Sequence, residues 1–140
     1  MNPMSSAQRK EFLSGKHVAV LSIDASIDGR PPASAPIWYT YDSDGLIRFT
    51  VNGTSRKARL LNHAKSVSLV VQNEELPYQY VVVECSVVET ANPTPVEFLE
   101  TVGTRYLGEE RGRAFMAGLQ NQLMFAVRPD RWLTAGAVIE

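Results

Sequence analysis

The sequence predicts a mostly β fold of the α+β class, in which about six largely antiparallel strands form a barrel flanked by short helices. Most apolar segments are strand-length runs rich in Val, Ile and Leu, and turn residues separate them. Connections this short favour antiparallel pairing. The chain has 140 residues, 44% of them hydrophobic and 21% charged, which suits one globular domain (1–140). So many strands in so short a chain favour a closed or nearly closed barrel, because closure removes exposed edges.

The first part of the chain is predicted to form a short helix followed by a β-meander. Ser5 and Gln8 have capping-box spacing and predict a helix through Leu13, which Gly15 can end. Asp28-Gly29 predicts a hairpin turn, since both residues tolerate positive φ. Prolines in and before the second strand remove ladder donors and place that strand late or at a sheet edge. The strands expected here span 17–25, 33–41 and 46–51.

The second part combines strands with a longer helical insert. Thr54 or Ser55 can cap a helix over 56–63. Strands are expected at 66–72 and 78–89, and the chain closes with one or two strands over 122–127 and 132–138, joined at Pro129-Asp130. Thr94-Pro95-Val96-Glu97 has a cap, a first-turn proline and a glutamate, and predicts a helix to Tyr106. A second helical piece over 109–119 follows. The charged residues of this insert suit an exposed, salt-bridged helix, and whether the insert covers a pocket or only packs on the barrel stays open.

Composition argues against several classes of function. The 14 Lys and Arg residues balance 15 Asp and Glu residues, and a net charge of -1 does not suit a general nucleic-acid or membrane-surface binder. One cysteine and two histidines predict neither an internal disulfide nor a metal site. The longest apolar run, 18–21, is far below the roughly 20 residues of a membrane span, and the N-terminus lacks a secretory apolar region. We therefore expect a cytoplasmic protein.

The sequence contains none of the common catalytic motifs. It has no G-x-S-x-G, P-loop, H-E-x-x-H or paired-cysteine pattern. Cys85 lies in an apolar run and is interpreted as a small buried residue. His17 and His63 have no partner at a suggestive spacing. The catalytic residues therefore stay unknown at this stage.

The most informative segment is 52–59, Asn-Gly-Thr-Ser-Arg-Lys-Ala-Arg. Arg56, Lys57 and Arg59 lie at the start of a predicted helix. The helix dipole disfavours cations there by about 0.3–1 kcal/mol each. A bound phosphate would reverse that sign, because backbone N–H groups, a hydroxyl and the cations would converge on it. A solvated basic face accounts for the same spacing, so both interpretations stay open.

The segment 49–58, Phe-Thr-Val-Asn-Gly-Thr-Ser-Arg-Lys-Ala, resembles the phosphate-binding segment of the pyridoxamine 5'-phosphate oxidase-like proteins, split-β-barrel binders of flavins and deazaflavins. The resemblance extends through 35–38, 76–84 and 129–132 and covers most of the chain. It implies that Ser55, Arg56 and Lys57 hold the cofactor phosphate. It also implies a homodimer with the cofactor in a groove between the subunits. The residues that would line the cofactor ring are Pro36, Ile37, Trp38, Thr50, Val51 and Asn52.

Several positions depart from the true oxidases, so oxidation of pyridoxamine phosphate is rejected. Ser34 stands where those enzymes have a further arginine, and Tyr80, beside Gln79, stands where a glutamine usually contacts the flavin. Cys85 replaces a frequent glycine, and the C-terminal substrate-phosphate signature is absent. The short chain and the segments around 36–38 and 77–80 look more like the branch that uses the deazaflavin F420.

The resemblance thus implies an oxidoreductase that binds F420, or alternatively FMN, and passes a hydride to a small unsaturated or carbonyl substrate. A non-catalytic cofactor carrier or sensor, and a barrel that has lost its cofactor and works through partner contacts, remain open. The acidic tail of F420 would benefit from Arg30, Arg48 or Arg59, although each suits the surface. Tyrosines that could donate a proton, although packing suits them better, are Tyr39, Tyr41 and Tyr78.

Overall fold

A computed structural model describes residues 2–136, and the strands in that range form one antiparallel sheet in the order β2-β1-β5-β6-β7-β4-β3. The mostly β, α+β fold class is confirmed. The strands are β1 (Ala19–Ile23), β2 (Ala33–Ile37), β3 (Thr40–Tyr41), β4 (Ile47–Asn52), β5 (Ser66–Asn73), β6 (Gln79–Ala91) and β7 (Gln122–Ala135). The helices are α1 (Ser6–Ser14), α2 (Arg56–His63), α3 (Val96–Leu107) and α4 (Glu109–Ala117), with a 3-10 turn, η1, at Ser26–Asp28.

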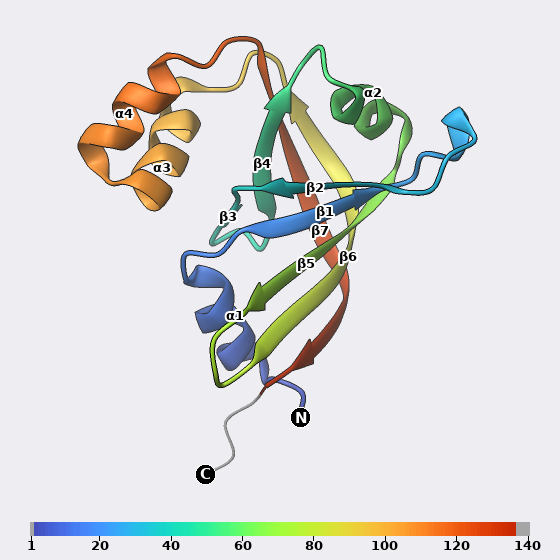
Figure 1. Ribbon diagram of the computed structural model, residues 1–140, viewed down its shortest axis with the longest axis vertical. Helices are drawn as coiled ribbons and strands as arrows, with labels where there is room; N and C mark the ends of the chain where they lie inside the picture. The colour runs from blue at the N-terminus through green and yellow to red at the C-terminus, as the bar shows by residue number, and fades with distance from the viewer. Residues whose placement is uncertain (1, 137–140) are drawn as a thin grey trace.

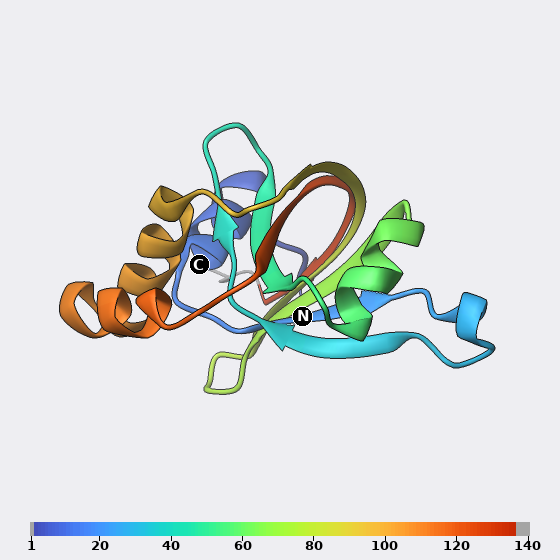
Figure 2. The same cartoon turned by 90° about the horizontal axis from the view of Figure 1, so that it is seen from above.

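The sheet curls into a split barrel, and the chain itself closes the curl. Its two edge strands, β2 and β3, are consecutive in sequence and are linked by Trp38 and Tyr39 (Figures 1 and 2). Alternate residues of each strand point inward, so Leu21, Phe49 and Phe125 are fully buried in one core. The strand count predicted a nearly closed barrel. In the structure its seam, where edge strands β2 and β3 meet, is bridged by the chain itself at residues 38 and 39.

Local sequence signals placed α1 and α2 correctly. Ser5 and Gln8 form the predicted capping box, and Phe12 and Leu13 of α1 enter the barrel core. Helix α2 spans the predicted residues, and its cap is Ser55, whose hydroxyl accepts a hydrogen bond from the Ala58 N–H. Both helices begin where a hydroxyl satisfies an otherwise unpaired backbone N–H.

The closing segment forms one strand, where the sequence left one or two strands open. Pro129-Asp130 does not separate two strands, because β7 runs continuously from Gln122 to Ala135. Pro129 lies beyond the part of β7 that pairs with β4, and the register with β6 shifts beside it. A β-bulge accommodates the proline, so the strand bends instead of ending. Residues 137 and 138 of the predicted last strand lie outside the described residues.

Two turns also differ from expectation. Asp28 belongs to η1 and only Gly29 takes positive φ (65°), so β1 and β2 are joined by a longer loop than a two-residue hairpin. The predicted second strand is divided at Trp38 and Tyr39 into β2 and β3, and β2 is at the expected edge. Thr94 does not cap α3, since its hydroxyl donates to the Gln122 carbonyl at 2.7 Å.

Helices α3 and α4 pack against each other to one side of the barrel (Figure 1). Their small apolar cluster is centred on Val102, Tyr106 and Met116 and is separate from the barrel core. Trp38 at the barrel seam packs against this cluster. None of the described helices has the length and apolar character needed to cross a membrane.

Candidate functional site

A cavity of about 370 Å³ lies between the barrel and the α3–α4 pair. The barrel wall consists of Val18, Pro36, Ile37, Trp38 and Thr50. Lys57 reaches the cavity from the first turn of α2. The structure thus gathers five of the residues expected from the sequence, namely Pro36, Ile37, Trp38, Thr50 and Lys57.

Apolar side chains of the helical insert form the opposite wall. Val102 of α3, Phe115 and Met116 of α4 and the following Leu119 line it. The sequence left open whether this insert covers the pocket, and in the structure it does. These residues went unassigned because the insert was interpreted as a charged surface helix.

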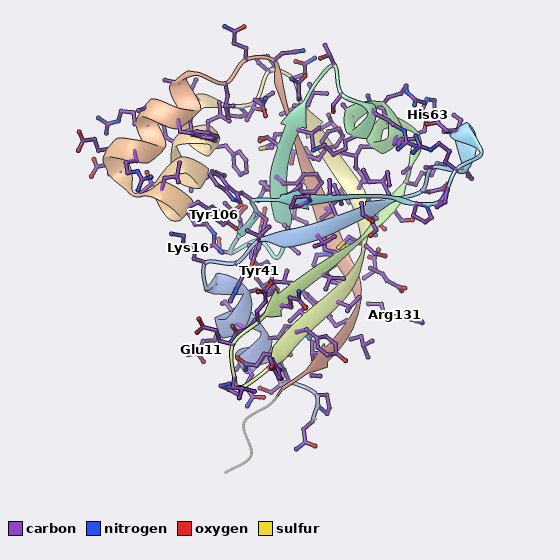
Figure 3. The ribbon with its side chains drawn as sticks, viewed as in Figure 1. Glu11, Lys16, Tyr41, His63, Tyr106 and Arg131 are labelled. Carbon is purple, nitrogen blue, oxygen red and sulfur yellow. The ribbon has the colours of Figure 1, made fainter. Side chains whose placement is uncertain are left out.

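The helical wall is attached to the barrel through Tyr106 and Trp38, whose rings stack at 4.7 Å with an interplanar angle of 3°. The Tyr106 hydroxyl donates to the His17 carbonyl at 2.6 Å and accepts from the Tyr39 N–H at 3.2 Å. Figure 3 shows Tyr106 between the helices and the barrel. This contact fixes one face of Trp38, which also lines the cavity.

Arg105 provides a second attachment. Its guanidinium donates to the carbonyls of Leu13 and Ser14 at 3.1 Å each, and of Gly15 at 2.7 Å. These carbonyls lie at the end of α1, where the helix dipole favours a cation. The expectation of an exposed, salt-bridged helix is therefore wrong for Arg105, although it holds for the exposed Arg113–Glu109 pair.

The turn before α2 uses its polar side chains internally. Asn52 Oδ1 accepts from the N–H and the hydroxyl of Thr54, at 2.9 and 2.8 Å. The Ser55 hydroxyl donates to the Asn52 carbonyl at 2.6 Å and caps α2. Val51 points into the core and is 3% exposed. Asn52 and Ser55 therefore shape the turn, Val51 belongs to the barrel core, and none of the three lines the cavity.

The cations of α2 are arranged around a carboxylate from the β1–β2 loop. Arg56 Nε donates to Asp28 at 3.0 Å, and both terminal nitrogens of Arg59 bind the same carboxylate at 2.8 and 3.0 Å. The hydrogen bonds from Arg59 and then Arg56 lower the pKa of Asp28 to about 2. Among residues 2–136, Lys57 forms no ion pair, so it is the cation of this helix turn that faces the cavity uncompensated.

A shallow groove of about 450 Å³ continues beyond Lys57. Lys57 lines both hollows, and Arg56, Arg30 and Ser34 line the groove. Of the arginines suggested for an acidic tail, only Arg30 adjoins this groove. Arg48 is paired with Asp42 and Asp44 at 2.6 and 2.7 Å, while Arg59 is held by Asp28.

The groups considered for acid–base chemistry lie away from the cavity. Cys85 is buried and its pKa is raised to about 12 by desolvation, which confirms its interpretation as a core residue. Tyr39 is buried and donates to the Leu13 carbonyl at 2.7 Å. Tyr41 packs near Trp132, and Tyr78 is exposed. His63 ends α2 on the far side of the barrel from α3 and α4 (Figure 3).

The cavity therefore offers a mostly apolar surface with a hydroxyl, Thr50, and an ammonium group, Lys57. Such a site suits a flat apolar ring attached to an anionic group. The described part of the chain contains no group of three His, Cys, Asp or Glu residues placed to hold a metal ion.

Comparisons with known proteins support the fold. No family model and no curated protein sequence matches the chain. Among solved structures, an F420 reductase superimposes with a TM-score of 0.72 at 20% identity over 89% of this chain and 94% of the other. A conserved hypothetical protein from Mycobacterium tuberculosis gives 0.74 at 21% identity over 94% and 84%. A candidate pyridoxamine 5'-phosphate oxidase from Listeria innocua gives 0.68 at 9% identity over 94% and 98%.

These likenesses extend over nearly the whole chain, at sequence identities that support conclusions about architecture only. The chain shares its split-β-barrel fold with these three proteins.

Proposed function

We propose that the chain is a pyridoxamine 5'-phosphate oxidase-like protein that binds F420, or alternatively FMN, in the cavity between the barrel and α3–α4. As an oxidoreductase it would transfer a hydride to a small unsaturated or carbonyl substrate. One observation carries this proposal: an uncompensated lysine in the first turn of α2 opens onto a largely apolar cavity. The likeness in fold to an F420 reductase supports it.

The residues fit the phosphate end of such a cofactor. Lys57 supplies an ammonium group beside the first turn of α2, where the dipole also favours an anion. Arg56 Nη2 is buried and has no protein partner within the described residues, and a bound anion would satisfy such a donor. Ser55 and Asn52 contribute by fixing the turn.

The remaining cavity fits a planar ring. Trp38, Pro36 and Ile37 offer an apolar surface, and Thr50 offers a hydroxyl. Phe115 and Met116 on the helical wall offer apolar side chains on the opposite side. When bound, the cofactor supplies the hydride chemistry of its ring, and the protein supplies orientation and a largely apolar environment.

The groove beyond Lys57 favours F420 over FMN. An acidic tail extending from the phosphate would run past Arg30, which has no ion pair among the described residues. FMN ends at its phosphate and would leave this groove unused. We therefore place F420 first.

We further propose a homodimer in which a second copy covers the outer face of the barrel near the cavity. Register pairing aligns apolar outward residues in a row across β2, β1, β5, β6 and β7. Val20 is 40% and Leu133 is 62% exposed. Pro36, at the β2 end of this row, also lines the cavity. A second copy that covers the row would therefore adjoin the cofactor. The row consists of Pro36, Val20, Val70, Val82 and Leu133.

A non-catalytic carrier or sensor is the alternative. The cavity lining favours this alternative. Among the described residues, its hydroxyl and ammonium groups come from Thr50 and Lys57, and no carboxylic acid, histidine or tyrosine lines it to serve as a proton donor. Reoxidation of reduced F420 in the presence of candidate enones and carbonyl compounds separates the two functions. A carrier would bind the cofactor without any substrate-dependent reoxidation.

The proposal is tested by titrating the protein with F420 and with FMN and following fluorescence quenching. Replacing Arg56 and Lys57 together with alanine should weaken binding about a hundredfold or more, since each hydrogen bond to a charged group contributes about 1.5–3 kcal/mol. The matched control replaces Arg111 and Arg113, two exposed arginines of α4, with alanine and should leave the affinity nearly unchanged. Equal affinity of the Arg56/Lys57 variant and the wild type would contradict the phosphate assignment.

A further inference from the structure

The loop between β1 and β2 is joined to the rest of the molecule largely through one carboxylate. Inside the loop, Asp28 and Arg30 N–H groups bond to the Ala25 carbonyl, and the Gly29 N–H bonds to Ser26. Among the described residues, the hydrogen bonds that connect 26–30 to another element are those that Asp28 accepts from α2. Figure 2 shows this loop projecting from the barrel beside α2.

Little else holds the loop in place. Ile27, its large apolar side chain, is 57% exposed. Gly29 has positive φ, and a side chain added there would meet no atom within 4 Å. The loop therefore has few packing contacts to lose if the Asp28 carboxylate leaves its partners.

The Asp28 carboxylate binds two arginines of α2, of which Arg56 lines the groove beside the proposed phosphate end of the cavity. Arg59 binds it with two parallel hydrogen bonds, in the geometry with which arginine also binds phosphate. Arg56, assigned above to the cofactor phosphate, gives its Nε–H to the same carboxylate. Because its pKa is lowered to about 2, Asp28 is an anion throughout the neutral range.

We propose that Asp28 is an internal competitor for the cofactor phosphate: it holds Arg56 and Arg59 in the ligand-free protein, and a bound phosphate takes over Arg56 and loosens the loop. This inference rests on the proposed function. The bound phosphate and the Asp28 carboxylate share the Arg56 guanidinium, so each weakens the binding of the other. By linkage, the loop is more mobile in the loaded protein, and the cofactor binds less tightly than the cations alone would allow.

The first test removes the negative charge of Asp28 and keeps the size of its side chain. Asp28→Asn should tighten F420 binding, or FMN binding if that is the cofactor, about three- to tenfold. This is the low end of typical coupling, because the pair is partly exposed to solvent. Asp44→Asn is the matched control, since Asp44 pairs with Arg48 and lies outside the cavity and its groove. Unchanged or weaker binding by Asp28→Asn would overturn the inference.

The second test observes the loop directly. A nitroxide label on Ile27→Cys reports loop mobility, because Cys85 is buried and its thiol stays unlabelled in the folded protein. The electron paramagnetic resonance spectrum of the labelled protein should sharpen when Asp28→Asn is combined with the label. It should also sharpen when labelled protein that keeps Asp28 is saturated with cofactor. A label on Val88→Cys, exposed on β6, should report no change. A loop equally immobile in all states would overturn the inference.

The two proposals fail in different ways. Weaker binding by the Arg56/Lys57 variant together with no effect of Asp28→Asn overturns the competitor and leaves the site standing. A wild-type protein that binds neither F420 nor FMN overturns both.

Discussion

The hydroxyl group of Tyr106, together with the ring that stacks on Trp38, connects the helical wall of the cavity to the barrel. Tyr106→Phe keeps the ring stacked on Trp38 but leaves the His17 carbonyl and the Tyr39 N–H without this partner. We expect a loss of about 1–3 kcal/mol in the free energy of unfolding, the cost of leaving buried polar groups unpaired. Denaturant unfolding measures it, with Tyr78→Phe as an exposed control. Equal losses in both variants would contradict this role.

Cys85 makes the stability depend on alkaline pH. Its pKa is raised to about 12 in the folded protein, whereas the pKa of a cysteine in an unfolded chain is about 8.5. The unfolded state therefore loses its proton first, and the contribution of Cys85 is present below about pH 8.5 and decreases as the pH rises toward 12. Denaturant midpoints between pH 7 and 10 should fall more for the wild type than for Cys85→Ala. Parallel curves would show that the thiol does not contribute.

Sequence patterns predicted single residues well where the partner is close along the chain. Ser55 was named as a possible helix cap, and the residue it caps lies three positions away. Asp28 pairs with Arg56 and Arg59, which lie 28 and 31 residues further along the chain, and no local pattern encodes such a pairing. For the same reason the sequence could not tell which cation of 56–59 stays uncompensated.

Helices α3 and α4 approach so closely that glycine is required at the contact. A Cβ on Gly112 would lie 2.3 Å from backbone atoms of Gly103. Gly112→Ala should therefore separate the helices, destabilise the protein by about 1–3 kcal/mol and displace the cavity wall. Gly118→Ala is the control, since its Cβ would meet only the Phe115 carbonyl at 3.5 Å. A Gly112→Ala variant as stable as Gly118→Ala would contradict this packing.

At the scale of elements, the sequence predicted the two helices of the insert but not the direction they face. Apolar residues at 98, 99, 102 and 106 have helical spacing, and this signal was available beside the charges. It could not reveal that Arg105 reaches the end of α1 or that Phe115 faces Trp38. The sequence could not decide between one and two closing strands, because a proline normally ends a strand, whereas here it lies at a bulge.

For the whole molecule, the proposed dimer depends on the apolar row across the outer face of the sheet. Leu133→Asp should convert the dimer to a monomer, because it places a charge in a contact that is otherwise apolar. Sedimentation velocity would measure the change. Val88→Asp, at an exposed apolar residue outside the row, should leave the assembly intact. A monomeric wild type would contradict the dimer itself.

The architecture was the most predictable property, because strand periodicity and short connections limit the possible topologies. The resemblance around 49–58 gave the split barrel, and the structure agrees. The seam could not be foreseen, since it depends on Trp38 and Tyr39 interrupting one apolar segment. The cavity arises at that seam, and its helical wall was assigned only from the three-dimensional arrangement.

The two edges of the sheet also determine how copies of the protein can grow into larger assemblies. Strand β3 has 2 residues, and β2 has 5 and contains Pro36, so both edges are poor templates for adding a strand from another chain. Contact through the apolar row in the proposed dimer would instead be face to face, and a self-complementary face is used up once two copies meet. The same fold that closes its seam through Trp38 and Tyr39 therefore favours finite pairs over open-ended fibres.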